Sequence, residues 1–274
     1  MIMLRRLAIF ALGSIVLVAC ASEQPGAAEA LAREQVITVP RAGAGQAGIL
    51  SVDEGAAPRF LAVLVPGGSA VIRPEQTGPG TVRSRLAGNF LVRSRRMLLA
   101  PDIAALTVDC RSDFEGGCPD AYQASAERVA DIEALVAEAR RPLPSIGEIW
   151  LIATSRGVIA SAAAARHGRG FAGIIHAAGV IDLAQELGLD FGGTTPQFLI
   201  HHAADPCGVT LHVSAQRLAR ARGLPLITAE GGNGFTGRPC EANTQHGFWS
   251  IEPRVIARIQ AIMRGTDRSG GMLR

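Results

Sequence analysis

An apolar, β-branched run ends abruptly at a serine-containing corner, and an alanine-rich stretch follows at once. The run starts at Ile149, the corner reads Thr-Ser-Arg-Gly, and the alanine-rich stretch extends to about His167. A strand that passes into a helix through so short a turn is typical of a parallel α/β sheet. Ala153 and Gly157 lie two positions before and two positions after Ser155, which is the small-x-Ser-x-small spacing of a nucleophile elbow. Alone, this spacing also fits an ordinary strand-to-helix connection.

Strand and helix patterns alternate through most of the sequence. The alternation predicts an α/β fold with a mostly parallel central sheet and helices on both faces. About twenty residues separate the strand at 171–176 from the next strand, so no large cap domain is expected there. Strands are expected at 36–39, 49–52, 59–65, 104–109, 149–154, 171–176, 197–201 and 225–229, a short strand or turn at 89–92, and helices at 121–140, 158–167, 211–222 and 251–263.

Composition narrows the possible functions. A chain of 274 residues that is 48% hydrophobic can bury one good core. The formal net charge of +3 is too small to indicate a nucleic-acid partner. Every one of the 27 basic residues is arginine, and the absence of lysine excludes Schiff-base chemistry and a P-loop lysine.

The N-terminal segment has the features of a bacterial export signal. Arg5 and Arg6 precede an apolar segment, 7–19, that is short for a membrane span. The segment ends in Leu-Val-Ala, directly before Cys20. This ending resembles a lipobox, in which the cysteine is lipidated; a plain signal peptide with a chance cysteine is the alternative. We expect a protein of the bacterial cell envelope, anchored to a membrane through its lipid and facing the periplasm. The expected organisation is a signal peptide at 1–19, a tether at 20–34 and a folded domain at 35–274.

Export would place the other cysteines in an oxidising compartment. There are four of them, Cys110, Cys118, Cys207 and Cys240, and four cysteines allow three pairings. We favour Cys110–Cys118, which closes a short loop, together with Cys207–Cys240, which joins two distant loops. Four free thiols are the alternative if the chain stays in a reducing compartment.

A nucleophilic serine needs a base and an acid that orients the base. His246 lies between the last expected strand and the last expected helix, and Asp205 follows the strand at 197–201. Both therefore follow strand ends, where an open α/β sheet places its site. Asp182, after the preceding strand, is the competing acid. Asp205 is favoured because a Cys207–Cys240 bridge would hold its loop beside His246.

From about Arg59 to the C-terminus, the chain resembles the α/β-hydrolase superfamily. The resemblance is carried by the elbow, by the order Ser, Asp, His, and by Pro-Gly-Gly-Ser at 66–69 after a buried strand. It implies that Ser155 is the nucleophile, His246 the general base and Asp205 the orienting acid. It also implies that the backbone N–H groups of Gly68 and Arg156 form the oxyanion hole.

Two positions depart from the pattern of that superfamily, since Ala153 replaces the usual elbow glycine and Pro66 replaces a common histidine. Neither is disqualifying, because alanine is small enough for the turn and Pro66 offers only its carbonyl. The resemblance implies a serine hydrolase that cleaves a carboxylic ester or related acyl bond of a small-molecule substrate, with no cofactor and no metal.

Two other hypotheses remain open at this point. A non-catalytic envelope lipoprotein could keep the same fold as a binding scaffold. A metallohydrolase could use His201, His202 and His212, although these residues lack the helical His-x-x-x-His spacing of a zinc site.

Overall fold

The computed structural model describes residues 32–41 and 43–274. The expected signal peptide, Cys20 and the tether up to residue 31 lie outside these residues. The first strand, β1, begins at Ala32, so residues 32–34 belong to the folded domain and not to the tether. Within the described ranges, no helix combines the length and the apolar character needed to cross a bilayer.

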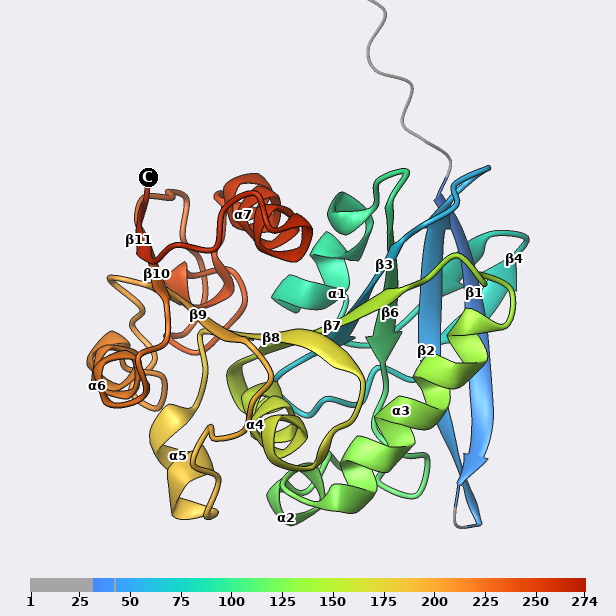
Figure 1. Ribbon diagram of the computed structural model, residues 1–274, viewed down its shortest axis with the longest axis horizontal. Coiled ribbons are helices and arrows are strands. Elements are labelled where there is room, and N and C mark those ends of the chain that lie inside the picture. The colour runs from blue at the N-terminus through green and yellow to red at the C-terminus, as the bar shows by residue number, and fades with distance from the viewer. Residues whose placement is uncertain (1–31, 42) are drawn as a thin grey trace, which may run out of the picture. The chain divides into compact units, whose positions relative to one another are not determined.

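A mixed sheet forms the centre of the described domain (Figure 1). Its strand order is β1-β2-β6-β3-β7-β8-β9-β10-β11. The pairs β1–β2 and β2–β6 are antiparallel, and every other neighbouring pair is parallel. The strands are β1 (Ala32–Arg41), β2 (Ala44–Asp53), β3 (Phe60–Val65), β6 (Ile103–Val108), β7 (Glu148–Thr154), β8 (Phe171–Ala177), β9 (Gln197–His202), β10 (Leu226–Ala229) and β11 (Gly271–Leu273), and a separate hairpin pairs β4 (Glu75–Gly78) with β5 (Thr81–Arg83).

Helices cover both faces of this sheet, and this confirms the predicted fold class. α3, α4, α5 and α6 contribute to the core on one face, and α1 and α7 contribute to the core on the other (Figure 1). α5 is the one helix described between β8 and β9, so no large cap is inserted there. The helices are α1 (Phe90–Ser94), α2 (Asp120–Gln123), α3 (Ala126–Arg140), α4 (Val158–His167), α5 (Ile181–Glu186), α6 (His212–Arg222) and α7 (Glu252–Arg264), with short 3-10 turns η1 (Arg95–Leu98), η2 (Ser155–Gly157) and η3 (Gln245–Gly247).

Two buried elements, β3 and α4, flank the serine corner. All six residues of β3 are buried, as its continuous apolar sequence predicts. Every residue of α4 from Val158 to Ala165 is also buried. Because alanine has little bulk, this helix packs closely on β7 and β8 and fixes the direction in which the chain leaves the corner.

Two local predictions were wrong. Residues 89–92 form no strand, because the Asn89 side chain accepts a hydrogen bond from the Leu91 N–H and starts α1. The single helix expected at 121–140 is divided into α2 and α3, because the Ser125 hydroxyl accepts from the Arg128 N–H and caps a new helix there.

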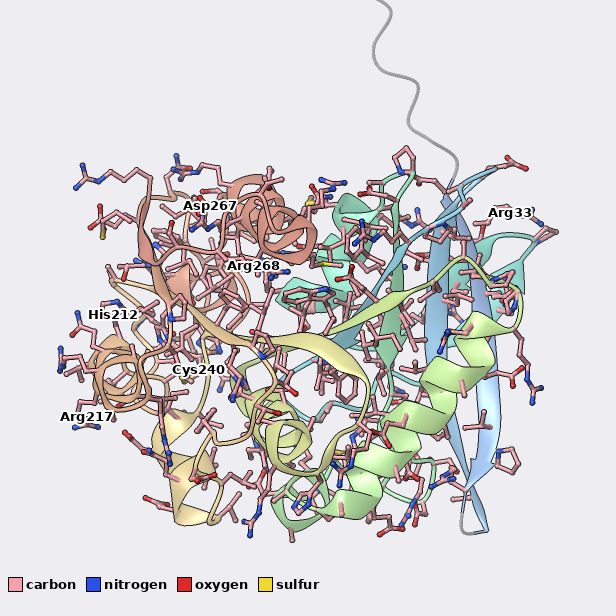
Figure 2. All side chains as sticks on the ribbon, viewed as in Figure 1. Arg33, His212, Arg217, Cys240, Asp267 and Arg268 are labelled. Atoms are coloured by element: carbon pink, nitrogen blue, oxygen red, sulfur yellow. A yellow bond between two sulfur atoms is a disulfide. The ribbon has the colours of Figure 1, made fainter. Side chains whose placement is uncertain are left out.

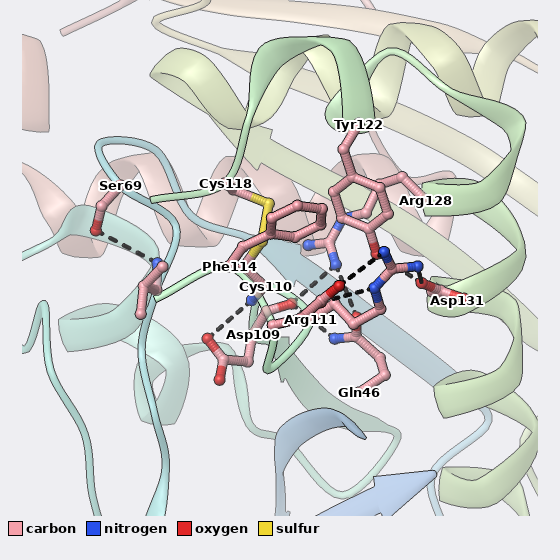
Figure 3. The surroundings of a disulfide bond; sticks show 12 residues. Gln46, Ser69, Asp109, Cys110, Arg111, Phe114, Cys118, Tyr122, Arg128 and Asp131 are labelled. Atoms are coloured by element: carbon pink, nitrogen blue, oxygen red, sulfur yellow. Dashed lines mark hydrogen bonds and ion pairs between the residues drawn. A yellow bond between two sulfur atoms is a disulfide. The ribbon is translucent and has the colours of Figure 1, made fainter. Parts of the chain in front are cut away.

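The Cys110–Cys118 disulfide lies in a polar and aromatic cluster after β6 (Figure 3). The rings of Phe114 and Tyr122 pack beside it with centroids 4.8 Å apart. The Tyr122 hydroxyl donates to Asp131 at 2.6 Å, and burial raises the pKa of Tyr122 well above its ordinary value. This cluster fixes the loop that follows β6.

A buried ion pair stabilises the start of β1, which begins at Ala32, before the strand expected at 36–39. Glu34 on β1 is 2% exposed, and its carboxylate binds the guanidinium groups of Arg95 and Arg96 at 2.7 and 2.8 Å. It also accepts a hydrogen bond from the Ser51 hydroxyl on β2. Burial raises the pKa of Glu34, but the two arginines outweigh burial and lower it to about 2.

Candidate active site

The serine corner is a strained turn at the end of β7. Ser155 has φ +54°, a left-handed conformation that is uncommon for residues other than glycine. Gly157 must be glycine, because a Cβ there would collide with the carbonyl groups of Val65 and Pro66. Ala153, where the usual pattern has glycine, lies fully buried in β7, so the strand accepts one methyl group.

The glycine loop after β3 lies directly against this corner. A Cβ on Gly67 would be 2.5 Å from the Ser155 Cβ and 2.7 Å from the Thr154 carbonyl oxygen, so no larger residue fits. Gly68 follows with φ +65°. Gly68, Ser155 and Arg156 line the same cavity, which is where the sequence predicted an oxyanion hole.

Three side chains that are far apart in the sequence meet at the serine. The Ser155 Oγ lies 3.1 Å from the His246 Nε2, and the His246 Nδ1 lies 3.0 Å from the Asp205 Oδ2. His246 is held in η3, whose start is capped by the Thr244 hydroxyl. The structure thus brings together the three residues that the sequence singled out.

The electrostatics of this group favour an ionised acid. Burial raises the pKa of Asp205, but hydrogen bonds from His201 and His246 outweigh burial and hold the pKa well below its ordinary value. A carboxylate accepts only, so the His246 Nδ1 must donate to it. The Nε2 of His246 is then free to accept the Ser155 hydroxyl proton.

The competing acid lies elsewhere. Asp182 on α5 accepts hydrogen bonds from Ser214 at 2.7 Å and from Arg217 at 3.1 Å, both on α6, where Figure 2 labels Arg217. Its side chain is 47% exposed, whereas the Asp205 side chain is fully buried. Of the two acids, Asp205 is therefore the one that contacts His246.

The second disulfide joins Cys207, two residues after Asp205, to Cys240, six residues before His246. Both cysteines line the cavity at Ser155, and Figure 2 labels Cys240. The covalent link therefore connects the loop of the acid to the loop of the base.

A cavity of about 470 Å³ opens at Ser155. Most of its other side chains are apolar, and the one arginine in its wall, Arg156, is bound to Asp120 at 2.5 Å. The apolar wall is made by Leu86, Phe90, Val180, Val209 and Ala242, together with the disulfide.

The His201 and His212 rings lie 5.8 Å apart between centroids, but each of the three histidines considered as metal ligands is hydrogen-bonded to another protein group. His202 donates to the Gly231 carbonyl, and His212 contacts the Thr228 hydroxyl. His201 binds the Thr210 carbonyl and approaches Asp205. In the part of the chain that the structure describes, no group of three or more His, Cys, Asp or Glu side chains is arranged to hold a metal ion.

Sequence reasoning missed one polar residue of this group. The Thr210 hydroxyl lies 2.9 Å from the Asp205 Oδ2 and 3.1 Å from the His246 Nδ1. A lone threonine five residues after an aspartate has no pattern that distinguishes it from a surface residue, so the sequence carried no usable signal for it.

No protein-family model and no curated protein matches this sequence. Solved structures do match. An alpha-beta serine hydrolase homologue from Coxiella burnetii aligns over 85% of this chain and 97% of its own, with a TM-score of 0.55 and 12% identity. Brefeldin A esterase, a bacterial homologue of human hormone-sensitive lipase, aligns over 85% of this chain and 76% of its own, with a TM-score of 0.56 and 15% identity. 

A cold-adapted esterase from an Arctic intertidal metagenomic library aligns over 85% of this chain and 94% of its own, with a TM-score of 0.55 and 11% identity. At such low identities the likeness concerns the fold. Together with the strand order and the helices on both faces, it shows that this chain has the α/β-hydrolase fold.

Proposed function

We propose that this protein is a serine hydrolase that cleaves a carboxylic ester. The observation that carries the proposal is the hydrogen-bonded chain from Ser155 through His246 to Asp205, with the serine at φ +54°. Nucleophile, base and orienting acid in this geometry are the requirement for acyl transfer to a serine hydroxyl.

The proposed reaction has two halves. In the first, the Ser155 Oγ attacks the acyl carbonyl carbon while His246 accepts the hydroxyl proton, and the Asp205 carboxylate stabilises the imidazolium. The tetrahedral intermediate collapses when His246 protonates the departing alcohol, which leaves an acyl ester on Ser155. In the second, water attacks that ester with His246 again as the base, and the carboxylic acid and free serine are released.

The oxyanion of each intermediate would be bound by the Gly68 and Arg156 N–H groups. Support comes from their position in the wall of the cavity beside Ser155. Arg156 also lies in the first turn of η2, where no side chain caps the free N–H groups.

The cavity favours an uncharged substrate. Its wall is mainly apolar, and the Arg156 guanidinium is already paired with Asp120. A charged acyl group would lose its hydration without gaining a free partner. We therefore propose a neutral small-molecule ester whose acyl or alcohol part fits about 470 Å³.

Labelling with a fluorophosphonate tests the proposal directly. The reagent should modify the wild-type protein at Ser155, and Ser155→Ala should remove both labelling and hydrolysis of a short p-nitrophenyl ester, by a factor of about 10⁴ or more. Ser145→Ala is the matched control, because Ser145 is exposed and lies before the start of β7. A wild-type protein that neither reacts nor hydrolyses esters would indicate a non-catalytic binding scaffold.

We also propose that the protein is exported and lipid-anchored at Cys20 in the bacterial cell envelope. Support comes from the two disulfides in the described domain, since disulfides persist in oxidising compartments. Metabolic labelling with an alkyne fatty acid in a bacterial host should mark the wild type and fail to mark Cys20→Ser. Equal labelling of both would exclude lipidation at Cys20.

A further inference from the structure

The carboxylate of Asp205 has more partners than the contact with His246 requires. Its Oδ1 accepts a hydrogen bond from the Cys207 N–H at 2.9 Å. Its Oδ2 lies 3.0 Å from the His246 Nδ1, 2.9 Å from the Thr210 Oγ1 and 3.4 Å from the His201 Nε2. Because the side chain of Asp205 is completely buried, these groups replace the water that a carboxylate would otherwise bind.

The Thr210 hydroxyl connects the acid to the base. A carboxylate only accepts, so the hydroxyl proton is donated to the Asp205 Oδ2. The lone pairs of the same oxygen then face the His246 Nδ1 at 3.1 Å. The Nδ1–H of His246 is thereby shared between Asp205 and Thr210. Both acceptors favour the tautomer that leaves the Nε2 unprotonated toward Ser155.

His201 fixes the loop that carries both of these groups. It lies at the end of β9, 1% exposed, and its Nε2 is 2.6 Å from the Thr210 carbonyl oxygen. A carbonyl only accepts, so this Nε2 carries a hydrogen, which also faces Asp205. One buried imidazole thus holds the acid near the start of the loop and Thr210 near its end.

We propose that His201 and Thr210 are positioning residues of the hydrolytic site, which fix the Asp205 carboxylate and the tautomer of His246. This inference rests on the proposed function. Neither residue is among those that line the cavity at Ser155, so neither touches a substrate bound there. Their removal should therefore lower kcat and leave KM unchanged.

Paired substitutions separate the hydrogen bonds from the packing. Thr210→Val keeps the shape and removes the hydroxyl, whereas Thr210→Ser keeps the hydroxyl. We expect Thr210→Val to lower kcat for a short p-nitrophenyl ester by about 10- to 100-fold, and Thr210→Ser to stay within about threefold of wild type. His201→Phe should lower kcat more than His201→Gln, whose amide N–H can replace the Nε2–H. Equal kcat values within each pair would overturn the proposal.

The same substitution in a second background tests whether Thr210 acts through the acid. In an Asp205→Asn background, Thr210→Val should lower kcat little further, because its partner is already altered. A purely structural role would lower kcat by the same factor in both backgrounds, and that result would contradict the proposal.

Nuclear magnetic resonance gives a readout that does not depend on turnover. In ¹⁵N-histidine-labelled protein, with His246→Gln used to assign the signals, wild-type His246 should be the Nδ1–H tautomer. Thr210→Val should increase the population of the Nε2–H tautomer of His246, and Thr210→Ser should leave that population unchanged. An unchanged tautomer in Thr210→Val would refute the positioning role, even in a protein that hydrolyses no ester. Absence of ester hydrolysis and of fluorophosphonate labelling would instead count against the proposed function.

Discussion

Gly67 and Ser155 are so close that a Cβ on Gly67 would lie 2.5 Å from the Ser155 Cβ. The two residues come from neighbouring parallel strands, β3 and β7, and meet just beyond the carboxyl ends of those strands. The glycine loop and the serine corner therefore form one packed unit, in which a single methyl group must displace backbone.

Replacing Gly67 tests this packing. Gly67→Ala should lower kcat/KM for a short ester by about 100-fold, because the methyl group must shift the elbow or the oxyanion loop by about 1 Å. The measurement is steady-state hydrolysis, with thermal unfolding to verify the fold. Gly147→Ala is the control, since a Cβ there meets nothing within 4 Å. Wild-type activity in Gly67→Ala would show that the close approach is not required.

Removing each acid in turn tests the assignment of Asp205. Asp205→Asn should lower kcat by about 10⁴, because an amide cannot hold the imidazole in the required tautomer or stabilise its charge. Asp182→Asn should change kcat by less than about twofold, since Asp182 contacts Ser214 and Arg217 and not His246. A larger loss in Asp182→Asn than in Asp205→Asn would reverse the assignment.

The two disulfides should differ in their effect on activity. Replacing Cys207 and Cys240 together by alanine should cost about 3–4 kcal/mol of stability, from the entropy of a loop closed over 33 residues, and should also lower kcat. Replacing Cys110 and Cys118 opens a loop of 8 residues, which should cost about 2–3 kcal/mol and leave kcat of the folded protein unchanged. Chemical denaturation measures the loss of stability, and ester hydrolysis measures kcat. Equal losses of kcat in the two double variants would contradict the expectation that only the Cys207–Cys240 disulfide affects activity.

Glu34 should contribute stability that depends on pH. Its pKa is about 2 in the folded protein and near 4.5 in the unfolded chain, so the folded state binds this proton less readily. The stabilisation is complete above about pH 5 and is lost as the pH falls toward 2. Glu34→Gln should therefore lower the free energy of unfolding by about 3 kcal/mol at pH 7, and by much less at pH 2.5.

Glu75→Gln is the matched control for Glu34, because Glu75 pairs with Arg83 on the surface and such pairs contribute little. Thermal unfolding at both pH values measures the effect. If Glu34→Gln lowers the free energy of unfolding equally at pH 7 and at pH 2.5, the ion pair is not the cause of the loss.

The central strands and the three residues at the serine could be predicted because each has a strong local signal. β3 is continuously apolar, and Ser155 lies between small residues at a strand end. Asp205 and His246 follow strand ends, and in a parallel sheet those ends meet at one edge. The sequence pattern therefore contained most of the information about which loops come together.

The remaining features depend on tertiary contacts that no local pattern encodes. Residues 89–92 include apolar residues that are common in strands. The Asn89 side chain caps the N-terminus of α1, however, and the segment forms a helix. The early start of β1 depends on Glu34 meeting Arg95 and Arg96, some 60 residues away. Thr210 matters only because its loop turns back onto Asp205.

The absence of lysine affects how the folding stability of this domain depends on alkaline pH. Its one tyrosine, Tyr122, is buried with a raised pKa, and the four cysteines of the described residues are oxidised in pairs. Lysine, free cysteine and tyrosine are the side chains that ordinarily lose a proton at alkaline pH, so between about pH 8 and pH 9.5 none of these three types changes charge in the described residues. Folding stability should therefore form an alkaline plateau, in which the ion pairs that arginine makes across this domain keep their full charge.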